Sequence, residues 1–173
     1  ICTGSTTILT NNTTGGKWYS RDELVATIDE NTGMATGISG GTVEIIYSVT
    51  NNVGCENSVS KVITVNTLPE FTIKPDLTID SDVDINACTK QVDYIAEVIG
   101  IPQPTLRYEF TGATQGTGNG TGSGSTFNRG ITNIRLTATN ACGTVDYNFS
   151  INLVDRQSPE ITCPYDATRY IKP

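Results

Sequence analysis

The five cysteines are the residues of this chain whose type and spacing could do chemistry. They are spread over its whole length, at Cys2, Cys55, Cys88, Cys142 and Cys163. No two of them form the C-x-x-C pair that zinc sites and dithiol redox sites use. We expect disulfides in an oxidising, extracellular setting; thiols buried in a reducing compartment are the alternative.

Other catalytic chemistry is restricted because the chain has no histidine. Ser-His-Asp triads, Cys-His pairs and histidine-zinc sites are therefore excluded. Carboxylates adjoin one another at Asp22 and Glu23 and at Asp29 and Glu30. Both pairs fall in expected turns, where solvent leaves little means of tuning a pKa for acid-base catalysis. We expect no active site, so the chain is predicted not to be an enzyme.

Aspartates alternate along the stretch "IDSDVDIN", at Asp80, Asp82 and Asp84. Hard cations prefer such clustered carboxylates, and the pattern is that of the opening of a calcium loop. The loop would continue with glycine and glutamate, where this chain has Ile85 and Gln91. A solvated strand face is therefore favoured, and no cofactor is expected. Calcium stays open as an alternative, here or at carboxylates near the module boundaries, namely Asp76, Asp155 and Glu160.

The charge balance bears on possible partners. Eleven basic and eighteen acidic residues give a net charge of −7, which opposes binding to nucleic acid or to anionic lipid. No run approaches the roughly 20 apolar residues that cross a bilayer, so we expect no membrane insertion. The first residues lack the features of a signal peptide, which is expected of a mature chain or an excised fragment.

Short runs of alternating apolar and polar residues predict an all-β fold. In "VDYNFSINLV" every second residue from Val145 to Leu153 is apolar, as expected of a strand with one buried face. "TVEIIYSV", "QVDYIAEV" and "NIRLTAT" follow the same pattern. Turn-forming segments such as "DENTGMA" and "SGG" separate the runs. Strands at this spacing predict β-sandwiches.

A repeated junction divides the chain into modules. Pro69–Thr72 in "VNTLPEFTIKP" parallels Pro159–Thr162 in "VDRQSPEITCP". Self-similarity at this separation indicates tandem modules. We predict one module at 1–67, a second at 68–157, and the first strand of a further repeat at 158–173.

This division sorts the cysteines. Cys2 and Cys55 fall in the first module and Cys88 and Cys142 in the second, at nearly equal separations. We therefore predict one disulfide within each module. Cys163 falls past the second boundary, and its expected partner lies outside the 173 residues.

The first module resembles the bacterial Ig-like group 2 domain of surface adhesins. That family has a strand tryptophan, a V-A-T-[VI]-D strand, a T-G turn, a T-G-[IV] segment and a G-T-x-x-I-x-Y strand. The matching residues are Trp18, Val25–Asp29, Thr32–Gly33, Thr36–Ile38 and Gly41–Tyr47. The flanking segments are similar to extensions of long secreted Bacteroidetes proteins, which supports pairing Cys2 with Cys55.

The second module resembles the hyalin repeat, which is also Ig-like and extracellular. Its G-S-x-F, x-x-G-x-T, T-A-T-[DN]-A-C-G and closing V-x-D-x-x-x-P-x-I-T-C-P elements match at Gly124–Phe127, Gly130–Thr132, Thr137–Gly143 and Val154–Pro164. Asn140 stands where that family frequently has aspartate, and the repeat's late second cysteine is missing. Residues 71–122 fit the pattern poorly.

The resemblances imply tandem Ig-like β-sandwich domains that form a stalk or spacer in a large secreted surface adhesin. Bacteroidetes proteins that mix these two repeat types resemble very large adhesins, including gliding-motility adhesins exported by the type IX system. Expected partners are neighbouring Ig-like repeats of the same chain, surface glycans and other cell-surface proteins. The alternative is a carbohydrate- or ligand-binding accessory module of a secreted enzyme. Trp18 could be its sugar platform, although core packing suits Trp18 better, and the glycine-rich segment 111–126 is expected to be a flexible or extended loop.

Overall fold

The computed structural model describes residues 1–158, which form fifteen strands and no helix. The all-β prediction is confirmed. The strands divide into two sets, β1–β6 and β7–β15, and no sheet combines strands from both sets. We call these sets module one and module two. Cys163 and all but the first residue of the predicted further repeat lie outside the described residues.

Module one is a sandwich of two three-stranded antiparallel sheets. One sheet has the order β1 (Thr6–Ile8), β4 (Met34–Gly37), β3 (Ala26–Ile28). The other has the order β2 (Lys17–Ser20), β5 (Gly41–Thr50), β6 (Glu56–Val65). The turn between β3 and β4 contains Gly33 at a φ of 72°, a left-handed conformation that glycine adopts without a Cβ clash.

The core of module one lies between these sheets. It contains Leu9, Ala26, Val43, Ile45 and Val65, with Trp18 and Ile28 packed against it. Val43, Ile45 and Tyr47 are buried on alternate positions of β5, as the sequence predicts. Ile38, the last residue of the T-G-[IV] match, is 46% exposed in the turn after β4, where its N–H donates to Val25 O.

Module two has nine strands. A five-stranded sheet has the order β12, β11, β14, β15, β8, and the facing layer consists of the pairs β10–β7 and β13–β9. Only the β8–β15 pair is parallel. The bounds are β7 Glu70–Ile73, β8 Thr78–Asp82, β9 Thr89–Val92, β10 Glu97–Ile99, β11 Thr105–Gly112, β12 Gly116–Asn119, β13 Ser125–Asn128, β14 Gly130–Asn140 and β15 Gly143–Val154.

The core of module two is larger and richer in aromatic residues. It includes Phe127, Ile134, Leu136, Phe149 and Ile151. The alternation predicted for β14 and β15 is confirmed, since their inward residues are buried or packed against this cluster. No disulfide crosses this core among the described residues, and apolar side chains fill it.

One predicted strand is interrupted. "QVDYIAEV" forms β9 and β10 with residues 93–96 between them outside any strand. Tyr94 in this gap donates its N–H to Ser123 Oγ (2.9 Å) and its hydroxyl to Thr121 O (2.6 Å). The buried Tyr94 therefore finds its partners in the 121–123 turn rather than along a strand ladder.

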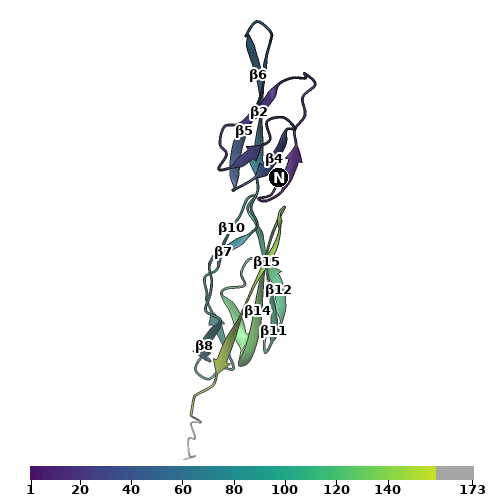
Figure 1. The fold of residues 1–173 in the computed structure, drawn as a ribbon. Coiled ribbons are helices and arrows are strands. Elements are labelled where there is room, and N and C mark those ends of the chain that lie inside the picture. The colour runs from purple at the N-terminus through teal and green to yellow at the C-terminus, as the bar shows by residue number, and fades with distance from the viewer. Residues whose placement is uncertain (159–173) are drawn as a thin grey trace, which may run out of the picture.

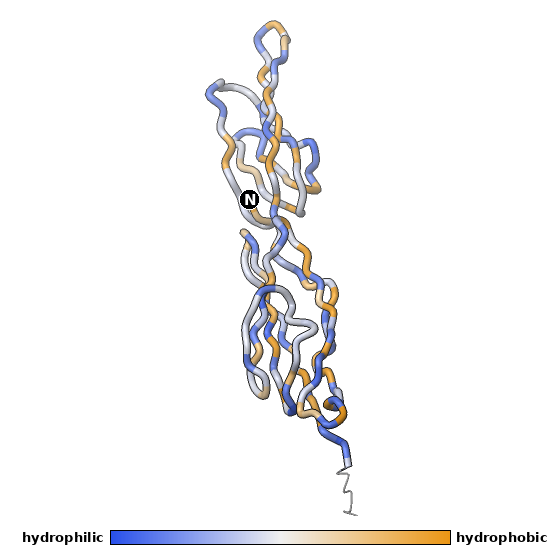
Figure 2. Tube along the Cα trace, turned by 180° about the vertical axis from the view of Figure 1, so that it is seen from behind, coloured by the Kyte–Doolittle hydropathy of each residue, from blue (hydrophilic) through white to orange (hydrophobic). Residues whose placement is uncertain are grey.

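The two modules lie end to end and give the molecule an elongated shape (Figure 1). The β5–β6 hairpin projects at one end, and β15 runs toward the other end. Hydrophobic and hydrophilic residues alternate along the long strands of both modules (Figure 2). The N-terminus lies beside the junction rather than at a tip of the rod (Figure 1), because Ile1 donates its amino group to Thr64 O (3.0 Å) at the end of β6.

Candidate functional site

A disulfide crosses the junction between the two modules. It joins Cys2, which forms a parallel bridge with Asn66, to Cys142 in the tight turn between β14 and β15. Their Cα atoms are 5.8 Å apart, a separation typical of disulfides. The two cysteines are 140 positions apart in the sequence. In the chain-entropy model, closing a loop of this length destabilises the unfolded state by roughly 5 kcal/mol.

The predicted pairs, Cys2 with Cys55 and Cys88 with Cys142, are therefore wrong. Cys55 lies in the turn after β5, a ten-residue strand that carries the chain away from the junction. Cys88 precedes β9, where its carbonyl accepts the Arg129 N–H at the far end of module two. Each predicted pair would have to span the length of a module. Among the described residues, Cys55 and Cys88 are exposed free thiols.

Backbone and side-chain hydrogen bonds surround this disulfide. Thr67 donates its N–H to Ile101 O (2.9 Å), and Ile101 returns its N–H to Thr67 Oγ1 (3.0 Å). Asn140 Nδ2 donates to Thr67 O (2.8 Å) and to Pro102 O (3.0 Å), and its Oδ1 accepts the Cys142 N–H (2.9 Å). One amide side chain thus connects both modules and the cysteine turn.

Two glycines at the junction lie against Thr67 and Leu68, the residues that connect β6 to the second module. A Cβ on Gly143 would lie 2.8 Å from Leu68 Cδ2, and one on Gly40 would lie 2.5 Å from Thr67 Cγ2. Real Cβ atoms do not come so near other carbon atoms, so a larger residue at either position would force the side chain of Thr67 or Leu68 to shift. The junction is therefore packed as well as covalently joined.

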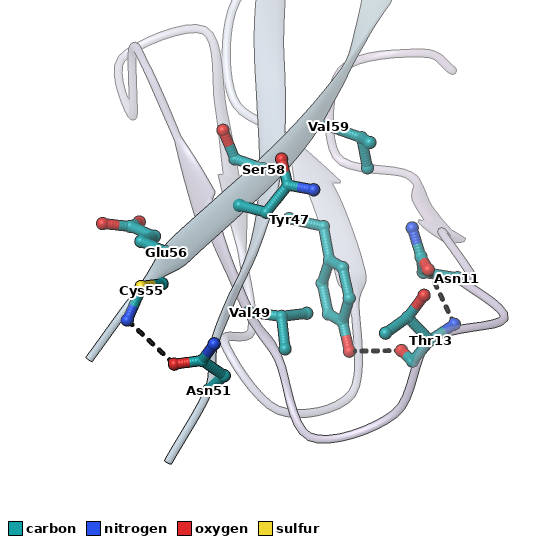
Figure 3. Close-up of a pocket in the computed structure, with 10 residues that line it drawn as sticks. Asn11, Thr13, Tyr47, Val49, Asn51, Cys55, Glu56, Ser58 and Val59 are labelled. Carbon is teal, nitrogen blue, oxygen red and sulfur yellow. Dashed lines mark hydrogen bonds between the residues drawn. The ribbon is translucent and has the colours of Figure 1, made fainter. Parts of the chain in front are cut away.

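A groove of about 320 Å³ lies beside the projecting β5–β6 hairpin (Figure 3). Tyr47 crosses it and donates its hydroxyl to Thr13 O (2.7 Å), while Gly16 N–H donates to the same hydroxyl (2.8 Å). Asn51 Oδ1 accepts the Cys55 N–H at the hairpin end of the groove (2.9 Å). Both hydrogen-bonding positions of the Tyr47 hydroxyl are used within the protein.

Trp18 packs in the core rather than presenting a sugar platform. Its ring lies 4.6 Å from the Tyr47 ring, centroid to centroid, and it contacts the core cluster of module one. Of the two interpretations of Trp18, sugar platform and core residue, the structure therefore favours the core residue.

Three of the aspartates considered as calcium ligands bond instead to neighbouring side chains. Asp80 accepts from Asn152 Nδ2 (2.9 Å), and Asp82 pairs with Arg156 (2.9 Å). Asp155 lies 3.7 Å from Arg129. Within residues 1–158, no three Asp, Glu, Cys or His side chains gather as a metal site would require. Glu160 lies outside the described residues.

Two aspartates have lowered pKa values for structural reasons. Hydrogen bonds from the Thr32 N–H and hydroxyl, then from the Asn31 N–H, lower the pKa of Asp29. The Arg135 guanidinium (2.6 Å), then the Thr137 hydroxyl (2.7 Å), lower the pKa of Asp146. Burial raises the pKa of Tyr94. Asp29 caps a turn and Asp146 joins two strands, so neither is poised as a catalytic acid or base.

The glycine-rich segment is ordered rather than a flexible loop. It contains β12, which pairs with β11. A Cβ on Gly118 would lie 2.6 Å from the Tyr108 hydroxyl oxygen, and one on Gly122 would lie 2.5 Å from Phe110 Cζ. The glycines are therefore required because aromatic rings occupy the space of side chains.

Comparisons with known proteins support the fold. No protein-family model and no curated protein matches the chain. A titin I-band fragment, I67–I69, has a TM-score of 0.52 and 15% identity over 88% of this chain and 61% of that one. The insect immune protein hemolin has a TM-score of 0.47 and 15% identity over 88% of this chain and 44% of that one. The chain spans about half the length of these structures. The fold is that of tandem Ig-like β-sandwiches.

No helix among the described residues has the length and apolar character needed to span a bilayer.

Proposed function

We propose that this chain is a stalk segment of an extracellular surface adhesin, in which stacked Ig-like modules hold an adhesive region away from the cell. The observation that carries the proposal is the Cys2–Cys142 bond between the modules. Tandem domains otherwise move relative to each other unless their interface is large. A covalent bond beside a packed junction suits a spacer that must keep its length.

Two features support the extracellular part of the proposal. Disulfides persist in oxidising compartments and are rare in the cytosol. The net charge of −7 opposes association with nucleic acid and anionic membrane surfaces. The partners of an extracellular stalk segment are then neighbouring Ig-like repeats of the same polypeptide and other cell-surface molecules.

The proposed assignment to a bacterial surface adhesin rests on residue patterns. The group 2 Ig-like pattern from Trp18 to Tyr47 and the hyalin-like pattern from Gly124 to Pro164 are those of long bacterial adhesins. We propose that the parent protein belongs among the exported Bacteroidetes surface adhesins, including those used for gliding.

The packing of Trp18 favours the spacer over the carbohydrate-binding alternative. Sugar platforms are exposed aromatic faces, whereas Trp18 packs against the Tyr47 ring and the core of module one. Specific glycan binding that is lost on changing Trp18 would reverse this preference.

Small-angle scattering tests the rigid spacer. We expect a single elongated particle for the native chain and a broader range of dimensions for Cys142→Ser, because the modules can then swing about Thr67. Cys88→Ser is the matched control, since it removes a thiol that makes no disulfide within the described residues. Equal scattering from the native chain and Cys142→Ser would contradict the proposed role of the bond.

A further inference from the structure

The last hairpin of each module has the same sequence pattern. Residues 41–51, which form β5 and the residue after it, align without a gap with residues 130–140, which form β14. The segments "GTVEIIYSVTN" and "GITNIRLTATN" have the same residue at four of eleven positions. Both end on an asparagine, and a cysteine stands directly before the next strand, Cys55 before β6 and Cys142 before β15. Cys55 is therefore the counterpart of Cys142.

The two asparagines make the same contact with the two cysteines. Asn140 Oδ1 accepts the Cys142 N–H, and Asn51 Oδ1 accepts the Cys55 N–H, both at 2.9 Å. At the junction, Asn140 Nδ2 also donates to Thr67 O, in the segment that leaves module one. Asn51 Nδ2 donates to no carbonyl oxygen within the part of the chain that the structure describes. Asn51 and Cys55 are exposed and lie next to each other at the groove of Figure 3.

The other free thiol among residues 1–158, Cys88, lies at the opposite end of its module. Cys88 is exposed and closely follows Asn86, whose N–H donates to Gln157 Oε1 (3.0 Å) in the segment that leaves β15. Cys2 has the corresponding place in module one, beside Asn66, the first residue after β6. Each module thus has one cysteine beside the segment that leaves its last strand.

The Cys2–Cys142 bond shows how the two kinds of cysteine combine. We call Cys2 and Cys88 exit cysteines, and Cys55 and Cys142 hairpin cysteines. The bond joins the exit cysteine of module one to the hairpin cysteine of module two. Both bonded cysteines are half-buried, whereas Cys55 and Cys88 are exposed. Within its described part, the chain therefore has one complete junction and one unused half-junction of each kind.

We propose that Asn51 and Cys55 form a docking site for another Ig-like module, which approaches with the end that contains its exit cysteine and forms a disulfide with Cys55. Asn51 Nδ2 then donates to a carbonyl oxygen in the segment that leaves that module, as Asn140 does to Thr67 O. Cys88 is the complementary half-junction, for the hairpin cysteine of a further module. The inference rests on the proposed stalk of stacked modules and names the residues that join it to its neighbours.

The proposed bond forms by oxidation of two thiols. The thiols lose two protons and two electrons as the S–S bond forms, and a disulfide oxidant such as oxidised glutathione takes up both and becomes two thiols. An oxidising extracellular compartment supplies such an oxidant. Docking raises the effective concentration of the two thiols, so a docked pair forms in preference to random pairs.

A second copy of the chain supplies the partner for a test. One variant keeps only the Cys55 thiol (Cys88→Ser, Cys163→Ser), and the other keeps only the Cys88 thiol (Cys55→Ser, Cys163→Ser). The two are mixed in a glutathione redox buffer, and mass spectrometry without reduction compares Cys55–Cys88 heterodimers with both homodimers and checks that Cys2–Cys142 is intact. We expect heterodimers to exceed a random mixture by about tenfold or more. The excess should vanish in denaturant.

Asn51→Asp tests the docking contact. The aspartate keeps an acceptor for the Cys55 N–H but has no donor for a carbonyl oxygen, so the excess of heterodimers should fall to a random mixture. Asn52→Asp makes the same change of charge in the same turn and should keep the excess. Random pairing with native Asn51 would overturn the proposal. So would an excess that persists in Asn51→Asp or in denaturant.

This test and the scattering test report on different junctions. Scattering reports on the Cys2–Cys142 junction within one copy, whereas the thiol mixture reports on Cys55 and Cys88 between copies. Random pairing together with a rigid native chain would remove the docking site and leave the two-module spacer. Selective pairing together with equal scattering from the native chain and Cys142→Ser would keep the docking site and remove the rigid spacer.

Discussion

At the scale of single residues, Asn140 does more than its place in a repeat pattern indicates. Its amide donates to carbonyl groups of both modules and accepts from the Cys142 backbone. The hyalin pattern frequently has aspartate here, but a carboxylate has no donor for Thr67 O and Pro102 O. The hydrogen bonds of the junction therefore require an amide at this position.

We expect Asn140→Asp to lower the free energy of unfolding by about 1–3 kcal/mol, because it removes two hydrogen bonds and turns a charge toward two carbonyl groups. Chemical denaturation measures the loss. Asn133→Asp makes the same change on the exposed face of β14 and should have little effect. Equal losses in the two variants would show that Asn140 does not hold the junction.

At the scale of elements, the sequence predicts strands best where one face is buried. In β14 and β15 the side chains alternate in the structure as they do in the sequence. In β5 the alternate residues Val43, Ile45 and Tyr47 are buried as predicted, but Ile46 between them is buried as well. The prediction fails at β12 and between β9 and β10, where tertiary contacts decide the backbone. Glycines of the 111–126 segment accommodate Tyr108 and Phe110, and Tyr94 bonds to a distant turn. A local pattern contains neither contact.

The glycine requirement in β12 can be tested within one strand. Gly118→Ala should destabilise the chain by roughly 1–3 kcal/mol, because its Cβ would meet the Tyr108 ring and overpack the site. Gly116→Ala is the matched control, since its Cβ would lie 3.9 Å from Phe110 Cδ2, an ordinary contact. Thermal melting distinguishes them. Similar melting of the two variants would restore the flexible-loop interpretation.

The pair of Arg135 on β14 and Asp146 on β15 gives the sheet a pH dependence. The pKa of Asp146 is lower in the folded chain than its ordinary value of 3.8. The stability from this pair is therefore present above that value and is lost as pH falls through the lowered folded pKa. Asp146→Asn removes the titrating group.

We expect the difference in melting temperature between the native chain and Asp146→Asn to shrink as pH falls below 3.8. Melting curves across acidic pH measure it, and an NMR titration of the Asp146 carboxyl gives the pKa directly. Asp76→Asn is a control that removes a carboxylate elsewhere in module two. A difference that stays constant through this range would contradict a lowered pKa.

At the scale of the whole molecule, the sequence predicts tandem sandwiches but not how they are joined. Assigning each disulfide to one module led to the wrong pairs. Strand direction contains the missing signal: β15 must run away from module one to leave by the far end, so the turn before it, with Cys142, faces the junction. Cys2 precedes the first strand and lies beside Asn66, at the end of module one that faces the junction.

The position of the bond also determines which parts of the chain bear tension. Force applied at the two termini passes from Cys2 through the disulfide to Cys142, and then along β15, which is already extended. The 140-residue loop between the cysteines is outside this path. The bond therefore limits extension across both modules at once, rather than within each one.

Stretching single molecules by handles at the two termini tests this load path. The oxidised chain should extend little, because β15 cannot lengthen further and both modules are bypassed. Reduction should release the chain between Cys2 and Cys142, which are 140 positions apart. The release adds roughly 500 Å of contour length at about 3.5 Å per residue. Cys142→Ser should behave like the reduced chain without any reductant, and Cys55→Ser should behave like the oxidised native chain. Unfolding of module one in the oxidised chain would show that tension does reach it and would refute the bypass.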